Sequence, residues 1–378
     1  MTRRAAVVYD CLFPLSLGGG ERLYRRVAEL LVERGFSTDY VTRTAWDELP
    51  VTTFRLVGLR PGEIYNARGV RTTLGAVIFA LGVWRYFIRH RNEYDVIIAS
   101  ALPVLTAIAV RVAVVGSRTR VVADWLEVWP AKKWRAYSGT VSGSVAYLLQ
   151  SLAARMIREH TVDSRFTADR LLLYRPRRPP VVLGLMDLVE SGTPRLPATP
   201  PFVFFVGRLI ADKGADTIPA ALALARRDIP GLRAVIVGDG PERSRILEAV
   251  TASGLGAVIE LTGRVSDERL DEIRATAVAL VAPSIREGFG LAVAEASAWG
   301  VPAVVVAHED NAAVDLIEEG INGFVVAPGD PAALAAGIVE AVRGGPTLRR
   351  STVEWFARAR VERGLSASLD VLLDGTAR

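Results

Sequence analysis

The sequence is poor in the residues that build disulfide frameworks and metal centres. Its 378 residues include one cysteine, Cys11, and three scattered histidines. A single cysteine excludes an internal disulfide, and isolated histidines give no spacing typical of metal ligands. The chain also lacks an Asp-x-Asp triplet, which often holds a divalent cation against a diphosphate. We therefore predict a cytoplasmic protein that needs no metal ion and no other cofactor.

Long uninterrupted apolar runs are also scarce. Residues 96–116 are long enough to cross a bilayer, but Pro103 and Arg111 interrupt them, so we interpret this run as a buried strand followed by a helix. Residues 74–88 are apolar and are flanked by arginines. Their nearly all-round apolarity favours a helix packed against a sheet, and the alternative is a helix resting on a membrane interface.

Charge is divided unevenly along the chain. Residues 1–200 hold 28 Lys plus Arg against 17 Asp plus Glu, whereas the remainder holds 18 against 24. A basic N-terminal half favours an anionic partner, such as a phospholipid surface or a lipid-linked diphosphate, and the alternative is a solvated arginine-rich surface. No recognition motif accompanies the charge, so we predict no contact with nucleic acid.

Two series of alternating strands and helices predict two α/β domains. The first begins with the apolar run at residues 5–11, a glycine-rich loop and a helical pattern over residues 21–34. The second begins at residue 201 and repeats strand and helix patterns. We predict two Rossmann-like, doubly wound domains that face each other across a cleft.

Periodicity is lost over residues 186–200, which gather Pro, Gly, Ser and Thr. We therefore place an interdomain linker there, between a first domain at residues 1–185 and a second domain at residues 201–347. A helical tail from residue 348 to residue 378 is expected to pack back onto the first domain.

The segment from Pro283 to Val306 contains most of the candidate ligand-binding residues. Glu287 ends a predicted strand, a Gly-Phe-Gly loop follows, and Glu295 lies on the next helix. Glycines let backbone N–H groups approach a ligand, and the N-terminus of a helix favours phosphate oxygens. Carboxylates beside a phosphate site are suited to accept hydrogen bonds from sugar hydroxyls.

This segment resembles the motif of two glutamates separated by seven residues in the retaining GT4 glycosyltransferases. The resemblance extends across the C-terminal half. It implies the GT-B arrangement, in which the domain at residues 1–185 binds the acceptor and the domain at residues 201–347 binds the donor. It implies that Glu295 binds the ribose of a nucleotide-sugar donor and that Glu287 contacts the transferred sugar. The backbone amides implied to hold the sugar and diphosphate are those of Gly288, Phe289, Gly290 and Leu291.

Two cations precede this segment. Arg208 follows a predicted strand, and Lys213, one of only three lysines, precedes the next helix. Two fixed cations can stabilise a leaving diphosphate in place of a metal ion. The resemblance assigns them this role, and it also implies that main-chain groups near Arg264 and Val265 contact the nucleobase.

The N-terminal half offers further candidates. Gly18 and Gly19 resemble the glycine loop that closes over the diphosphate in GT4 enzymes. Asp124 and Glu127 are candidate acceptor-side groups, because they can accept a proton or a hydroxyl hydrogen bond. Leu126 stands where many relatives present a histidine.

A second departure from the family pattern follows His308. Many relatives carry paired glycines before a glutamate in this loop, whereas this chain has Asn311, Ala312 and Ala313 and then Asp315. We expect this difference to affect sugar selectivity and not the fold.

The resemblance to the GT4 family implies a retaining hexosyltransferase that moves a sugar from a UDP- or GDP-linked donor to an acceptor hydroxyl. The acceptor would be a glycan, a lipid-linked molecule or a small molecule, in cell-surface glycan or glycoconjugate synthesis. The basic N-terminal half of the sequence predicts, in addition, peripheral contact with an anionic membrane. Two alternatives stay open: a non-catalytic subunit that binds the donor or serves as a scaffold, and a nucleotide-sugar epimerase of the same fold.

Overall fold

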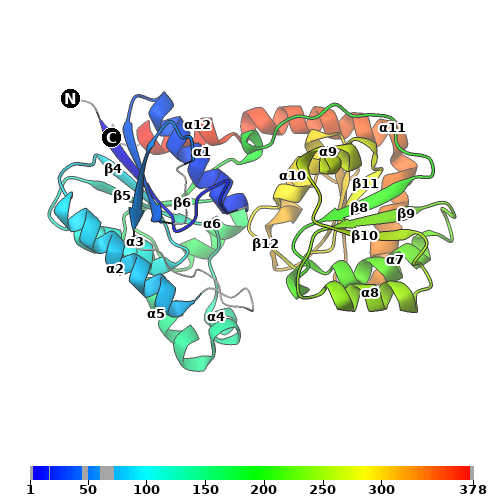
Figure 1. The fold of residues 1–378 in the computed structure, drawn as a ribbon, viewed down its shortest axis with the longest axis horizontal. Helices are drawn as coiled ribbons and strands as arrows, with labels where there is room; N and C mark the ends of the chain where they lie inside the picture. Colours follow the sequence, from blue (N-terminus) through cyan, green and yellow to red (C-terminus); the bar gives the residue numbers. More distant parts are fainter. Residues whose placement is uncertain (1–2, 17, 45–49, 60–71, 375–378) are drawn as a thin grey trace. The chain divides into compact units, whose positions relative to one another are not determined.

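The computed structural model describes residues 3–16, 18–44, 50–59 and 72–374 of the chain (Figure 1). The chain forms two compact units. The first comprises Met1–Leu188 together with Leu365–Arg378, and the second comprises Val189–Gly364. Each unit contains a parallel sheet covered by helices, so the predicted pair of Rossmann-like α/β domains is confirmed.

The described residues of the N-terminal unit form a seven-stranded parallel sheet with the order β3-β2-β1-β4-β5-β6-β7. The strand order reverses between β1 and β4, as in doubly wound folds. The strands are β1 (Arg4–Val8), β2 (Ser37–Arg43), β3 (Arg55–Leu59), β4 (Val96–Ser100), β5 (Arg120–Trp125), β6 (Glu159–Val162) and β7 (Val181–Val182).

Helices cover both faces of this sheet. Ala6 and Val8 of β1 point to the hydrophobic core under α2, α3 and α5, whereas α1 and α12 contact each other over the opposite face (Figure 1). The helices are α1 (Gly19–Glu33), α2 (Thr73–Arg89), α3 (Val104–Ala113), α4 (Ala131–Ser138), α5 (Thr140–Met156), α6 (Arg165–Leu172) and α12 (Leu365–Asp374), with the short 3-10 turn η1 (Met186–Leu188).

The C-terminal unit has a six-stranded parallel sheet with the order β10-β9-β8-β11-β13-β15, plus the small pair β12-β14. The strands are β8 (Phe202–Val206), β9 (Arg233–Val237), β10 (Ile259–Gly263), β11 (Ala279–Ala282), β12 (Arg286–Glu287), β13 (Ala303–Val306), β14 (Asp310–Asn311) and β15 (Gly323–Val326). The helices are η2 (Ala211–Lys213), η3 (Ala215–Thr217), α7 (Ile218–Ala225), α8 (Arg243–Ala252), α9 (Asp267–Thr276), α10 (Leu291–Ala298), η4 (Ala312–Leu316) and α11 (Pro331–Glu362).

The C-terminal tail differs from its prediction. We placed the domain boundary at residue 348, but α11 continues to Glu362 within the C-terminal unit. Leu348, Trp355 and Phe356 are buried there, and Leu348 belongs to the hydrophobic core of that unit. Only α12 packs on the N-terminal unit.

The predicted linker is also divided between the units. Gly192 N–H donates to Ala298 O at 3.1 Å, and Arg195 N–H donates to Ala275 O at 3.1 Å, so both residues belong to the C-terminal unit. Asp187, by contrast, caps α12 in the N-terminal unit. Its carboxylate accepts hydrogen bonds from Leu365 N–H at 2.6 Å and Ser366 N–H at 3.2 Å.

The helix predicted over residues 74–88 is present as α2, and its two sides differ. Phe79, Val83 and Phe87 are buried against the sheet, as the favoured interpretation requires. Leu74 and Leu81 are exposed on the other side. In the described ranges of the chain, no helix combines the length and apolarity needed to cross a membrane.

Candidate functional site

The strand order of the C-terminal sheet indicates where a ligand binds. From β8, the chain adds β9 and β10 on one side and β11, β13 and β15 on the other. In such sheets, ligands bind beyond the carboxyl ends of the strands at the point where the order reverses. Here that point lies between β8 and β11. The loops that follow these strands are residues 207–213 and 283–290, which contain Arg208, Lys213 and Glu287 among the predicted site residues.

These two loops are fastened to each other. Lys213 Nζ lies 2.5 Å from Glu287 Oε1. Arg286 pairs with Asp212 at 2.8 Å, and Ile285 N–H donates to Asp212 O at 2.9 Å. Lys213 and Glu287 are thus brought together from positions 74 residues apart. Sequence reasoning missed Asp212 and Arg286, because nothing in the linear pattern pairs them.

Glu287 is held from its other side by the loop after β13. The short strand β12, which contains Glu287, pairs with β14. Asn311, at the end of β14, donates from Nδ2 to Ser284 O at 2.9 Å and to Val306 O at 2.8 Å. The departure at Asn311 therefore has a structural function: its buried amide ties the Glu287 loop to the sheet.

Helix α10 begins at the same place. Gly290 precedes it with φ of +99°, a conformation that disfavours residues with a Cβ. A Cβ added there would lie 2.6 Å from Ala313 Cβ. The first N–H groups of a helix have no acceptor within the helix, so the start of α10 offers donors and a favourable dipole to an anion.

We expect Gly290→Ala to destabilise the C-terminal unit by about 1–3 kcal/mol and to weaken nucleotide binding, because the left-handed backbone and the contact with Ala313 must both relax. Urea unfolding and nucleotide titration measure these effects. Gly254→Ala is a matched control in the same unit: its φ is +68°, but an added Cβ meets nothing within 4 Å. A Gly290→Ala protein as stable as the Gly254→Ala protein would contradict the argument.

Glu295 lies inside α10 and forms an ion pair with an arginine of α9. Its Oε2 atom lies 2.5 Å from the guanidinium of Arg274, and the two side chains are only 16% and 12% exposed. Arg274 also pairs with Asp271 at 3.3 Å. Arg274 therefore fixes the orientation of the Glu295 carboxylate. Sequence analysis did not identify Arg274, because it lies 21 residues before Glu295 and in no recognised motif.

The remaining predicted donor residues lie at the same edge of the sheet. Arg208 lies two residues after the end of β8, with an exposed side chain that makes no ion pair with any residue described. Arg264 and Val265 follow β10; Arg264 is exposed and Val265 is partly buried. Their predicted roles remain predictions.

In the N-terminal unit, Gly18 and Gly19 lie at the start of α1. A Cβ on Gly18 would lie 2.3 Å from the Glu21 carboxylate, which accepts a hydrogen bond from Ser16 Oγ at 3.3 Å. Leu126 lies against the same turn, since a Cβ on Gly20 would be 3.0 Å from Leu126 Cδ1. The residue in the usual histidine position thus faces the glycine loop.

The two acceptor-side candidates have different surroundings. Asp124 is buried, and its carboxylate accepts hydrogen bonds from Tyr24 Oη at 2.5 Å and Thr161 Oγ1 at 2.6 Å. Burial raises the pKa of Asp124 to about 6, while these hydrogen bonds oppose the rise. Glu127 is partly buried and accepts a hydrogen bond from the indole N–H of Trp129.

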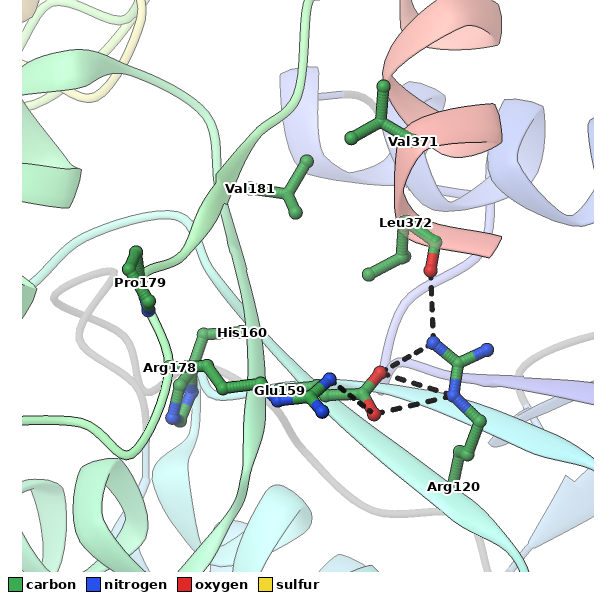
Figure 2. Close-up of a pocket in the computed structure, with 8 residues that line it drawn as sticks. All are labelled: Arg120, Glu159, His160, Arg178, Pro179, Val181, Val371 and Leu372. Carbon is green, nitrogen blue, oxygen red and sulfur yellow. Dashed lines mark hydrogen bonds and ion pairs between the residues drawn. The ribbon is translucent and has the colours of Figure 1, made fainter. Parts of the chain in front are cut away.

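A pocket in the N-terminal unit does not qualify as the candidate active site. This pocket has a volume of about 80 Å³. Its lining includes Arg120, Glu159 and residues of α12 (Figure 2). Arg120 pairs with Glu159 at 2.6 Å and donates to Leu372 O at 2.9 Å, so the charges serve to fasten α12. Arg120 and Glu159 begin their strands, and ligands of such sheets bind at the opposite edge.

Comparison with known proteins shows which family the C-terminal unit resembles. Residues 190–354 match the family model described as glycosyl transferases group 1. Alpha-D-kanosaminyltransferase of Streptomyces kanamyceticus is 35% identical over 155 residues, covering 41% of this chain and 39% of that protein. This chain thus spans well under half of the length of that relative.

Solved structures show the same fold along the whole chain. Sucrose-phosphate synthase from Thermosynechococcus elongatus superposes with a TM-score of 0.79 and 20% identity, covering 99% of each chain. HepE of Anabaena in complex with UDP superposes with a TM-score of 0.70 and 18% identity, again covering 99% of each chain. Two Rossmann-like parallel sheets with these neighbours define the GT-B class. Within the C-terminal unit, residues 190–354 are similar to the glycosyl transferases group 1 family.

Proposed function

We propose that the protein is a retaining glycosyltransferase that moves a sugar from a UDP- or GDP-linked donor to an acceptor hydroxyl without a metal ion. The C-terminal unit would hold the donor. Glu295 would bind the ribose and Glu287 the transferred sugar. The backbone amides of residues 288–291 would hold sugar and diphosphate oxygens.

One observation carries this proposal: Lys213 Nζ lies 2.5 Å from Glu287 at the reversal point of the C-terminal sheet. The pair puts a cation beside the carboxylate that would contact the sugar. When the bond between sugar and diphosphate breaks, negative charge develops on the diphosphate oxygens, and Lys213 with Arg208 would stabilise it. The acceptor hydroxyl would then attack the same face of the sugar and give its proton to the leaving diphosphate, which retains the anomeric configuration.

A nucleotide panel tests the donor site. UDP, GDP and their sugars are titrated by calorimetry and thermal shift in the presence of EDTA. We expect saturable binding of one nucleotide, followed by sugar transfer when acceptors are supplied. Folded protein that binds no nucleotide would overturn the donor site, and transfer that requires an added divalent cation would overturn metal independence.

A non-catalytic donor-binding or scaffold subunit is the second candidate, and Leu126 beside the glycine loop is the observation that favours it. Nucleotide binding without sugar transfer to any acceptor would support this candidate. An epimerase of the same fold would instead convert the nucleotide sugar to its epimer in the absence of an acceptor, which chromatography of the products distinguishes.

The acceptor side of the proposal follows from the N-terminal unit. We propose a glycan, a lipid-linked molecule or a small molecule as acceptor, with Asp124 or Glu127 on its side of the site. We also propose peripheral contact with an anionic membrane. The basic N-terminal half of the sequence supports this contact.

A further inference from the structure

The outer side of α2 carries a stripe of large apolar side chains. They recur at intervals of three or four residues, which places them on one side of a helix. Leu74 is 71% exposed and Leu81 is 59% exposed, values that decide against a packed interface within the described chain. The exposed members are Leu74, Val77, Ile78, Leu81, Trp84 and Ile88.

The stripe continues onto the neighbouring helices of the same layer. Helix α3 contacts both α2 and α5 on the same face of the sheet (Figure 1). Exposed apolar residues on α5 recur with the same helical spacing, and two more lie at and just after the C-terminal end of α3. These residues are Val141, Val145, Leu148 and Leu152 on α5, and Val112 and Val115 by α3. Single exposed apolar residues are normal, but a group of this size marks an interaction surface.

The charge on these helices has one sign. The sequences of α2, α3, α4 and α5 contain no aspartate or glutamate. They contain seven cations: Arg85, Arg89, Arg111, Lys132, Lys133, Arg135 and Arg155. On the opposite side of the sheet, α1 and α12 carry five acidic residues, Glu21, Glu29, Glu33, Asp370 and Asp374, against three arginines, Arg22, Arg25 and Arg26, which leaves a net charge of −2. The N-terminal unit is therefore polarised between its two helical layers.

We propose that the outer surface of α2, α3 and α5, which we name the apolar-basic face, docks on a bilayer that contains anionic lipid. Apolar side chains, an interfacial tryptophan and arginines on one helix are the features of helices that lie in the membrane interface. Cations near an anionic leaflet add attraction that weakens with salt. A second copy of the chain is a poorer occupant, because a twofold contact would oppose cations with cations. The inference specifies the surface for the proposed membrane contact and does not depend on sugar transfer.

Vesicle sedimentation tests the proposal on the full chain. Vesicles of phosphatidylcholine alone are compared with vesicles that also contain phosphatidylglycerol, at physiological ionic strength. We expect wild type to bind the anionic vesicles more strongly, with affinity falling as salt rises. Leu81→Glu should lower the partition coefficient at least about tenfold, because it removes a buried leucine from the interface and adds a like charge.

Two further variants locate the effect. Leu247 on α8 of the C-terminal unit is 56% exposed, so Leu247→Glu is the matched control and should bind as wild type does. The double change Arg85→Glu and Arg89→Glu should weaken binding to anionic vesicles and leave the weak binding to phosphatidylcholine unchanged. Circular dichroism and nucleotide titration of each variant show that the fold and the donor site persist.

Equal vesicle binding by wild type and Leu81→Glu would overturn the proposal, as would wild type that binds nucleotide but no vesicle. Light scattering adds one more decisive outcome. The wild-type protein could form a dimer that binds no vesicle and that Leu81→Glu converts to a monomer. This result would overturn the proposal and show that the apolar-basic face is an interface between two copies of the chain. Nucleotide binding is scored separately, so failure of this inference and failure of the proposed transferase function give different results.

Discussion

Lys213→Ala is expected to lower kcat/KM for sugar transfer by about 10²–10³-fold, the loss seen when one preorganised group that stabilises developing charge is removed. The structure supplies the reason: Lys213 Nζ is fixed 2.5 Å from Glu287, at the edge of the sheet where a diphosphate would lie. An ammonium held in place costs little reorganisation as charge develops on the leaving group. Initial rates with the donor identified by the nucleotide panel measure the effect.

Two companion variants sharpen this prediction. Lys213→Arg keeps the charge but changes its geometry, so it should retain part of the activity. Arg233→Ala is the control, because Arg233 is an exposed cation at the start of β9, the edge of the sheet opposite the site. If Lys213→Ala kept the wild-type kcat/KM, the assigned role of Lys213 in stabilising the leaving diphosphate would be wrong.

Glu295→Ala is expected to weaken binding of the nucleoside diphosphate by about 10–100-fold, because a hydrogen bond to a charged group contributes about 1.5–3 kcal/mol. The carboxylate is 16% exposed and held at 2.5 Å by Arg274, so it is already oriented before a ribose hydroxyl reaches it. Calorimetric titration of wild type and variant measures the loss. Glu295→Gln should lose less, because its amide oxygen still accepts a hydrogen bond.

Arg274→Ala separates orientation from contact. If Arg274 only positions Glu295, the variant should bind nucleotide more weakly than wild type but better than Glu295→Ala. Glu272→Ala is the control: this glutamate lies on the same helix as Arg274, is 58% exposed and pairs with Arg269. Unchanged nucleotide affinity in Glu295→Ala would remove Glu295 from the donor site, whatever the fate of Arg274.

The fold was largely predictable because the apolar and polar residue patterns of each strand and helix match its burial in the structure. The apolar run after Asp95 predicted a buried strand, and β4 occupies Val96–Ser100. The helix predicted over residues 21–34 is α1, Gly19–Glu33. Buried parallel strands are apolar on both faces, and each helix that connects them needs an apolar stripe. Hydrophobic periodicity therefore predicts a doubly wound fold.

The predictions were wrong or incomplete where an apolar segment could pack against more than one part of the protein. The tail after residue 348 has the apolar spacing of a packing helix, but spacing does not say which core it enters. The structure places Leu348 and Trp355 in the C-terminal unit and leaves only α12 for the N-terminal one. For α2, composition favoured burial, and the structure shows that one side is buried and the other exposed.

The sequence by itself determined the two α/β domains and the strand-to-helix loops with Lys213, Glu287 and Glu295, because short-range periodicity and glycine placement decide both. Only the tertiary structure decided that Lys213 contacts Glu287 and that Arg274 orients Glu295. It also decided that Asn311 anchors the loop that contains Glu287. These contacts join positions 21 to 74 residues apart. The physical reason is that the order of strands in the sheet determines which loops become neighbours, and no local pattern in the chain encodes that order.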